Sequence, residues 1–185
     1  MVKSKGKNKG TTSRWIIVTI FAVLAGVAYF LFFLGMSRTG KENYVLIDED
    51  DNIDSVYTKL QPISTPQGFW VFKQLAGIMG YADKIRPGRF VVGSSGSLQT
   101  SRHIINGLQA PVTVTIRSVR TIEDLATDVS KKLMFTRAEL LSRLKSKEVC
   151  KKYGFTPETI PAMFIPNTYD FYWNTSVDKF LDKMS

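Results

Sequence analysis

The stretch Trp15–Met36 reads WIIVTIFAVLAGVAYFLFFLGM and contains twenty-two residues without a single charge, thirteen of them Ile, Val, Leu or Phe. A helix of this length covers about 33 Å, and the hydrocarbon layer of a bilayer is about 30 Å thick. A buried core helix is usually shorter, and the apolar part of a signal peptide has about 7 to 15 residues. The sequence therefore predicts a retained transmembrane helix over residues 15–36.

The two flanks of this stretch differ in charge. Residues 1–14 carry no acid and five positive charges, at Lys3, Lys5, Lys7, Lys9 and Arg14. The first turns after the stretch carry only Arg38 and Lys41. Because positive flanks stay in the cytoplasm, we expect residues 1–14 to be a cytoplasmic basic tail. Residues 37–185 would then lie outside the cytoplasm, on the cell-wall side of the inner (plasma) membrane of a bacterium.

Composition excludes several classes of protein. The formal net charge is +9, but removing the five charges of the tail leaves about +4, so no nucleic-acid partner is expected. Cys150 is the single cysteine, which excludes an internal disulfide. His103 is the single histidine, so a histidine-rich zinc site is excluded and no metal is expected. The sequence has no phosphate-binding G-x-x-x-x-G-K-[ST] loop, and no cofactor is expected.

Residues 37–110 read as a first α+β region. A strand over 44–47 precedes the acidic turn Asp48–Asp51, and apolar residues at helical spacing follow over 53–60. Thr65–Pro66 is typical of the start of a second helix, and a second strand is expected to end near Val92. The acidic turn does not have the spacing of an EF-hand calcium loop. Trp70 lies beside the apolar face of the second helix, where a core or half-buried role is favoured over a sugar-stacking role.

The strand and first helix of this region recur farther along the chain. Val45-x-Ile47 followed by Ile53 matches Val114-x-Ile116 followed by Ile122, at an offset of 69 residues. A strand feeding a short helix, used twice, is typical of small α+β modules. Thr121 and Thr136 each begin a capping-box pattern. Residues 111–160 therefore read as a second strand-helix-helix region.

Residues 162–173, AMFIPNTYDFYW, form the densest aromatic stretch of the outer part. They resemble a motif of the YceG-like family of endolytic murein transglycosylases, close to Glu-Gly-x-Phe-x-Pro-Asp-Thr-Tyr. Phe164, Pro166, Thr168 and Tyr169 coincide with that motif. Pro161-Ala162 stands in place of the Glu-Gly, and Asn167 replaces the Asp. The segments around 85–90 and 114–126 resemble the family as well.

This resemblance implies an α+β architecture: a single amino-terminal transmembrane helix, LysM-like α+β modules and the start of a mixed α/β catalytic domain. Residues 37–110 would be LysM-like, and residues 161–185 would begin the catalytic domain. The family's general acid is a glutamate well past the motif, expected beyond Ser185, so the chain reads as the amino-terminal portion of a longer enzyme. Substrate-binding candidates are Asn167, Tyr169, Tyr172 and Trp173, because aromatic faces stack on sugar rings and amides bond hydroxyls. A core role is equally expected for Phe164, Phe171 and Trp173.

The resemblance also implies an activity. A lytic transglycosylase cleaves the MurNAc–GlcNAc linkage of nascent peptidoglycan, leaves 1,6-anhydroMurNAc ends and thereby terminates strand elongation. Its partners would be glycan strands, the inner membrane and peptidoglycan synthases. The alternative is a non-catalytic, membrane-tethered module that binds the cell wall or acts as a scaffold. The two readings differ in whether a glutamate is available as general acid.

Overall fold

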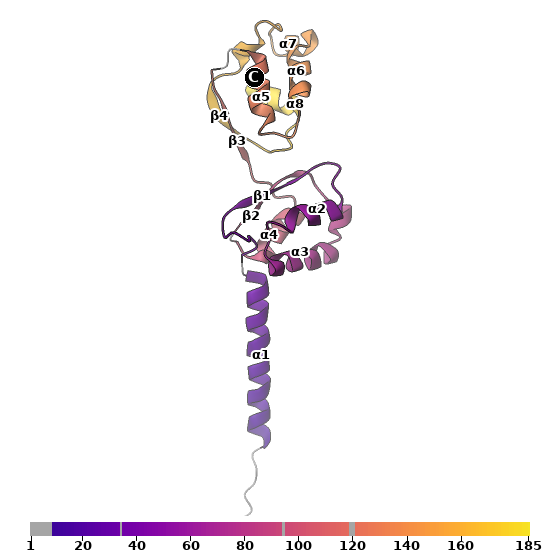
Figure 1. The fold of residues 1–185 in the computed structure, drawn as a ribbon, viewed down its shortest axis with the longest axis vertical. Coiled ribbons are helices and arrows are strands. Elements are labelled where there is room, and N and C mark those ends of the chain that lie inside the picture. The colour runs from indigo at the N-terminus through magenta and orange to yellow at the C-terminus, as the bar shows by residue number, and fades with distance from the viewer. Residues whose placement is uncertain (1–8, 34, 94, 119–120) are drawn as a thin grey trace, which may run out of the picture.

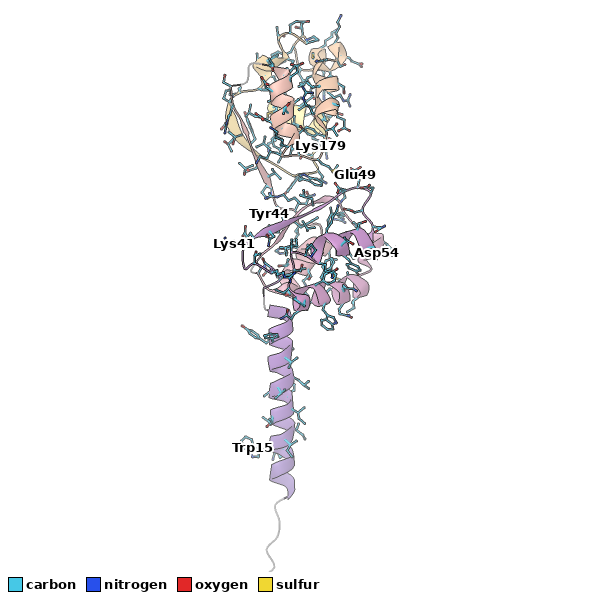
Figure 2. The ribbon with its side chains drawn as sticks, in the orientation of Figure 1. Trp15, Lys41, Tyr44, Glu49, Asp54 and Lys179 are labelled. Atoms are coloured by element: carbon cyan, nitrogen blue, oxygen red, sulfur yellow. The ribbon has the colours of Figure 1, made fainter. Side chains whose placement is uncertain are left out.

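The computed structural model describes residues 9–33, 35–93, 95–118 and 121–185, which form one long helix and two α+β units in a row (Figure 1). Helix α1 (Lys9–Phe33) extends away from the first unit, and Figure 2 shows Trp15 near its distant end. The second unit lies on the opposite side of the first unit from α1 (Figure 1).

The prediction of a transmembrane helix over residues 15–36 is corrected by the structure. Among the described residues, no helix is both long and apolar enough to cross a bilayer. The predicted segment is also not helical throughout, because α1 ends at Phe33 and Met36 is fully buried in the core of the first unit.

The first unit contains a two-stranded antiparallel sheet covered by helices. Strand β1 (Asn43–Ile47) pairs with β2 (Gly88–Val92), with Val45 opposite Phe90. The helices are α2 (Ile53–Leu60), α3 (Pro66–Ile78) and α4 (Ser97–Ile105), with a short 3₁₀ turn, η1 (Tyr81–Asp83). Alternate strand residues point into one core together with apolar residues of the helices.

Side-chain caps fix where these helices begin. The Asn52 side chain accepts a hydrogen bond from the Ser55 amide at 2.9 Å, and Thr65 Oγ1 accepts one from the Gly68 amide at 3.1 Å. Both satisfy amides that have no partner inside the helix. The predicted start at Thr65–Pro66 is therefore confirmed.

The second unit repeats the plan of the first. Strand β3 (Val112–Ile116) pairs antiparallel with β4 (Asn167–Phe171). Between them lie α5 (Ile122–Ser130), α6 (Arg137–Leu144), α7 (Lys147–Lys152) and the 3₁₀ turn η2 (Ile160–Met163), and α8 (Val177–Met184) follows. β3 begins 69 residues after β1, and α5 begins 69 residues after α2, so the predicted repeat of a strand followed by a short helix is confirmed.

The closing strand and last helix share the core of the second unit. β4 and α8 come from residues 161–185, which the sequence sets apart as the start of a catalytic domain. Their Phe171 and Phe180 pack with Leu125, Leu140 and other apolar residues of 111–160. We therefore propose that residues 111–185 fold as one unit, and the LysM-like character of residues 37–110 stays a prediction.

Hydrogen bonds link the two units. The Asn174 side-chain amide donates to the Pro87 carbonyl at 3.1 Å, and Arg89 Nη1 donates to the Pro111 carbonyl at 2.5 Å. Gln109 Nε2 also donates to the Pro87 carbonyl, at 3.3 Å. The linker between the units is therefore held to the end of the first sheet.

Candidate functional site

The sheet of the second unit carries a row of polar side chains on its exposed face. Thr113 Oγ1 donates to Asp170 Oδ1 at 2.8 Å, and the hydroxyls of Thr115 and Thr168 lie 3.3 Å apart. Each pair joins directly opposite residues of β3 and β4. Cross-strand pairs of this kind stabilise a sheet, and they also give this face hydroxyl and carboxylate groups that can bond a polar ligand.

Asn167 and Tyr169 lie on β4. Asn167 is exposed at the start of the strand, where its side-chain oxygen accepts from the Thr168 amide at 2.7 Å. Tyr169 is half-buried against the core, its ring 6.4 Å from that of Phe171, and its hydroxyl donates to the Ile165 carbonyl at 3.3 Å. Asn167 is therefore open to a ligand, whereas Tyr169 is largely committed to packing.

Tyr172 and Trp173 follow β4 and have different surroundings. Tyr172 is 57% exposed and lines a pocket of about 410 Å³ with Asp170, Lys179 and Lys183. Trp173 is half-buried against the core, and its carbonyl accepts from the Met134 amide at 2.9 Å. Of the four predicted substrate-binding residues, only Tyr172 lines this pocket, so the structure does not gather the four at one place.

The core reading is confirmed for Phe164 and Phe171, which are 5% and 4% exposed. Phe171 faces inward because residues at every second position of a strand share a face. Its ring also lies 4.7 Å from the ammonium of Lys183, which donates to the Asp170 carbonyl at 2.5 Å. These contacts hold the Lys183 ammonium beside Tyr172, so a ligand stacked on Tyr172 would meet a positive charge.

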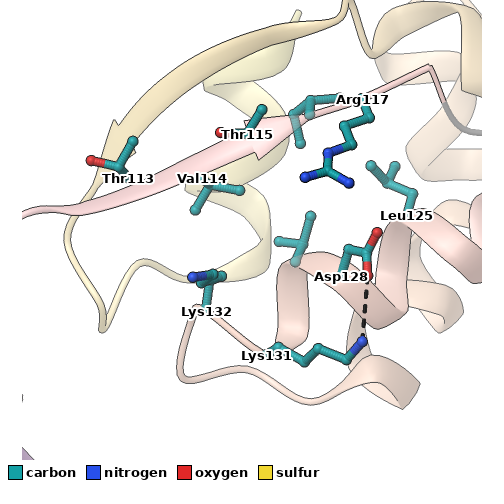
Figure 3. Close-up of a pocket in the computed structure, with 10 residues that line it drawn as sticks. Thr113, Val114, Thr115, Arg117, Leu125, Asp128, Lys131 and Lys132 are labelled. Atoms are coloured by element: carbon teal, nitrogen blue, oxygen red, sulfur yellow. Dashed lines mark hydrogen bonds and ion pairs between the residues drawn. The ribbon is translucent and has the colours of Figure 1, made fainter.

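A second pocket, of about 300 Å³, lies between β3 and α5 (Figure 3). Its floor is apolar, and Arg117, Lys131 and Lys132 bring positive charge to its rim. Asp128 is the acidic residue in this lining, and it pairs with Lys131 at 3.4 Å. Figure 3 shows the Arg117 guanidinium directed into the space between the strand and the helix.

Sequence reasoning missed this pocket. The available signal was a cation directly after a strand, Arg117, and two cations directly after a helix, Lys131 and Lys132. Nothing in the sequence shows that these ends meet, because that depends on how α5 packs on the sheet. The excess of positive charge suits an anionic ligand such as a carboxylate or phosphate.

The acidic turn of the first unit is neutralised by a lysine. Lys59 Nζ lies 2.6 Å from Asp48 and also bonds Asp51. The ammonium thus takes the position beside these carboxylates where a cation would sit. In the described part of the chain, no group of three or more His, Cys, Asp or Glu residues is placed to hold a metal ion.

Several carboxyl groups have pKa values below their ordinary range. A hydrogen bond from Lys145 lowers the pKa of Glu123, and the Thr136 amide lowers that of Glu139. The Thr156 side chain lowers the pKa of Glu158, and Lys152 lowers that of Asp182. These groups stay ionised at neutral pH and are poor proton donors, whereas a general acid needs a raised pKa.

Together these features define an α+β protein of two units, each a two-stranded antiparallel sheet packed with helices, with cationic pockets around the second sheet. A comparison with protein families matches residues 45–185 to the YceG-like family. The match covers most of the chain, and the chain therefore belongs to the YceG-like family.

Among solved structures, the chain is similar to a protein of Listeria monocytogenes described as yceG-like, with 17% sequence identity and a TM-score of 0.38. The similarity covers 78% of this chain and 53% of the other, so the chain spans about half the length of that relative. The comparison with curated proteins gave no match.

Proposed function

We propose that this chain is part of a peptidoglycan lytic transglycosylase and that it holds a glycan strand during cleavage. The observation that carries the proposal is the YceG-like family match over residues 45–185. The substrate would be nascent peptidoglycan outside the cytoplasm, and the bond cleaved would be the MurNAc–GlcNAc linkage. Peptidoglycan synthases, which make such strands, are proposed partners.

The proposed reaction needs a single carboxyl group that acts twice. A general acid gives its proton to the bridging oxygen as the bond to C1 of MurNAc breaks. The C6 hydroxyl of the same sugar then attacks C1, and its proton returns to the carboxylate, which gives a 1,6-anhydro end without water. Such a carboxyl needs a pKa raised by an apolar setting.

The carboxyl groups with lowered pKa values do not suit that role. Glu123 and Glu139, for example, are held ionised by hydrogen bonds to their charged forms. We therefore propose that the described residues bind the glycan strand and do not supply the general acid through these carboxyl groups.

The two pockets of the second unit support a binding role. Tyr172 offers an exposed ring beside Lys179 and Lys183, and the other pocket is rimmed by Arg117 and Lys132. Peptidoglycan strands carry carboxylates on their stem peptides, and these pair with ammonium and guanidinium groups. Sugar rings have apolar faces that stack on an aromatic ring.

The test is digestion of purified sacculi by the whole gene product. We expect soluble fragments that end in 1,6-anhydroMurNAc, identified by mass spectrometry. Tyr172→Ala should raise KM and leave kcat nearly unchanged, because its ring touches the strand away from the reacting bond. Lys147→Gln, an exposed change that lines neither pocket, is the control. Fragments with ordinary reducing ends would overturn the proposal.

A second candidate is a wall-binding or scaffold module without chemistry of its own. The exposed Tyr172 ring beside Lys179 and Lys183 suits this role, because binding alone needs no proton donor. In that case the whole gene product would sediment with sacculi and release no fragments. Tyr172→Ala would then weaken sedimentation alone.

A further inference from the structure

The second sheet has a free edge. Strand β3 (Val112–Ile116) pairs with β4 on one side, and no strand among the described residues pairs with its other side. In an antiparallel pair, alternate residues direct their amide and carbonyl groups toward the partner, and the residues between them direct these groups away. No hydrogen bond within the described part of the chain joins the outward groups of β3 to another segment. These groups are therefore available to an added strand.

The residues of β3 favour pairing at this edge. The strand reads VTVTI, and all five residues are β-branched, which suits an extended backbone. Proteins usually protect an exposed edge with a proline, a charged side chain or a bulge. β3 contains none of these, because its pairing with β4 runs without interruption from Val112 to Ile116 and its side chains are uncharged. An unprotected edge of this kind is a template for another extended chain.

The pocket of about 300 Å³ between β3 and α5 lies along this edge. Its lining includes the consecutive residues 113–117, so side chains from both faces of the strand border it. Figure 3 shows β3 on one side of the space and α5 on the other. Extended peptides bind at exposed sheet edges through backbone hydrogen bonds, while pockets beside the edge select their side chains. This part of the second unit offers both features.

The floor of this pocket is apolar. Val114, Leu125 and Val129 line it and are at most 2% exposed, since they also belong to the core of the second unit. An added strand would direct every second side chain toward this floor. Apolar side chains at those positions would leave water on binding, which favours the complex.

The unpaired charges of the pocket are positive. Asp128 is the acid in the described lining, and Lys131 pairs with it at 3.4 Å. Arg117 and Lys132 are exposed and form no ion pair with any described residue. Figure 3 places Arg117 toward the end of β3 and Lys132 nearer its start. An acidic side chain at each end of a bound segment would therefore meet a cation, and such charge-assisted bonds are stronger than neutral ones.

We propose that the pocket between β3 and α5 binds an extended, acidic segment of a partner protein, which adds to the sheet beside β3. Backbone hydrogen bonds to the free edge hold the segment, and acidic side chains facing Arg117 and Lys132 select it. A ladder of backbone bonds needs a regular extended polypeptide, so a protein segment fits this edge better than a saccharide does. The proposed activity rests on the family match and does not require this segment.

The probe is a dye-labelled peptide, Glu-Val-Thr-Val-Glu with an amidated end, titrated into the whole gene product and followed by fluorescence anisotropy. We expect saturable binding that is at least tenfold weaker for the uncharged peptide Gln-Val-Thr-Val-Gln. A tenfold change corresponds to about 1.4 kcal/mol. Arg117→Gln with Lys132→Gln should remove this preference for the acidic peptide. Lys147→Gln removes an exposed cation outside the pocket and should keep the preference.

Methylation of the peptide backbone separates strand addition from attraction between charges. The amides of the two valines point to one side of an extended peptide, and those of the threonine and the last glutamate point to the other. Methyl groups on one of these two sets should abolish binding, and methyl groups on the other should leave it, because only one side faces β3. With the unmethylated peptide, the β3 amides that do not bond β4 should gain protection from hydrogen exchange.

Equal effects of the two methylated sets would overturn the proposal, and so would unchanged exchange in β3 or the absence of binding at millimolar peptide. It would also fail if β3 amides responded to a GlcNAc–MurNAc tetrapeptide and not to the acidic peptide, which would assign the pocket to the glycan strand. None of these results alters the products that the whole gene product releases from sacculi, so the proposed activity is tested separately.

Discussion

Gly68 and Met36 approach each other so closely that a Cβ atom on Gly68 would lie 3.1 Å from the Cα atom of Met36 and 2.9 Å from its Cγ atom. Helix α3 thus packs against the segment after α1 with no room for a side chain. The contact involves the backbone of Met36, which cannot move aside as a flexible side chain would. This approach draws the end of the uncharged stretch into the core of the first unit.

Gly68→Ala should therefore destabilise the first unit by about 1 to 3 kcal/mol, as other additions to a packed core do. Urea unfolding followed by circular dichroism measures this change. The control is Gly77→Ala in the same helix, where nothing lies within 4 Å of the added atom. Because alanine favours helix over glycine by up to about 1 kcal/mol, the control should be neutral or stabilising. Equal effects of the two variants would contradict the packing described.

Lys59→Gln should make the first unit less stable, by about 1 to 3 kcal/mol near neutral pH, since it leaves the Asp51 carboxylate without its charged partner. Burial raises the pKa of Asp51, but hydrogen bonds from Lys59 and the Asp48 amide outweigh it and hold that pKa below 3.8. A lowered pKa contributes stability that is present above the unfolded value and lost as pH falls through the folded value.

The difference in unfolding free energy between wild type and Lys59→Gln should therefore shrink as pH falls below about 3.8. Urea unfolding from pH 7 to pH 2 measures it. Lys131→Gln removes an ion pair whose two side chains are 66% and 64% exposed, and it should change stability little at any pH. A difference in unfolding free energy that stays constant down to pH 2 would contradict the contact between Lys59 and Asp51.

Phe180→Ala should destabilise the second unit by about 3 to 5 kcal/mol, the usual cost of removing a buried aromatic ring. Phe180 is fully buried, and its ring lies 5.7 Å from that of Phe135, 6.2 Å from Phe164 and 5.2 Å from Phe171. Phe180 therefore joins residues on both sides of the boundary that the sequence predicts between residues 111–160 and 161–185.

Hydrogen exchange shows whether residues 111–185 are one folding unit. In Phe180→Ala, amides of α5 and α6 should lose protection together with those of β4 and α8. Tyr172→Ala, at an exposed position, should leave protection unchanged. A loss of amide protection confined to residues 161–185 would show instead that these residues form a separate unit.

Cys150 should react slowly with iodoacetamide while the protein is folded. Its thiol is fully buried and donates to the Leu144 carbonyl at 3.2 Å. Burial raises the pKa of Cys150 above 9.0, with a further contribution from Glu158, so little reactive thiolate is present at pH 8. Ser142→Cys adds an exposed thiol to the same chain as an internal reference. Mass spectrometry should find position 142 labelled quickly and Cys150 labelled only as urea is added; equal rates would contradict the burial.

The sequence by itself determined the local structure. Thr65 and Thr136 cap helices where their patterns predict, because a cap depends on residues within one turn. The repeat of β1 and α2 in β3 and α5 was visible for the same reason, since each copy is a continuous stretch. Other helix starts are not marked as clearly in the sequence: Gly96 precedes α4 without a side-chain cap, and Ser176 rather than the adjacent Thr175 caps α8. Neighbouring hydroxyl residues compete for one cap, and the path of the chain before the helix selects between them.

Only the tertiary structure decided which segments meet. Met36 belongs by composition to the apolar stretch, yet its contact with Gly68 places it in a core. β4 pairs with a strand more than fifty residues earlier, and this pairing turns Phe171 inward while Tyr172 faces a pocket. Trp70 is 49% exposed because it lines a pocket at the α2–α3 corner instead of entering the core. Burial depends on the partner that packs against a residue, and that partner lies too far away in the sequence for a local pattern to reveal it.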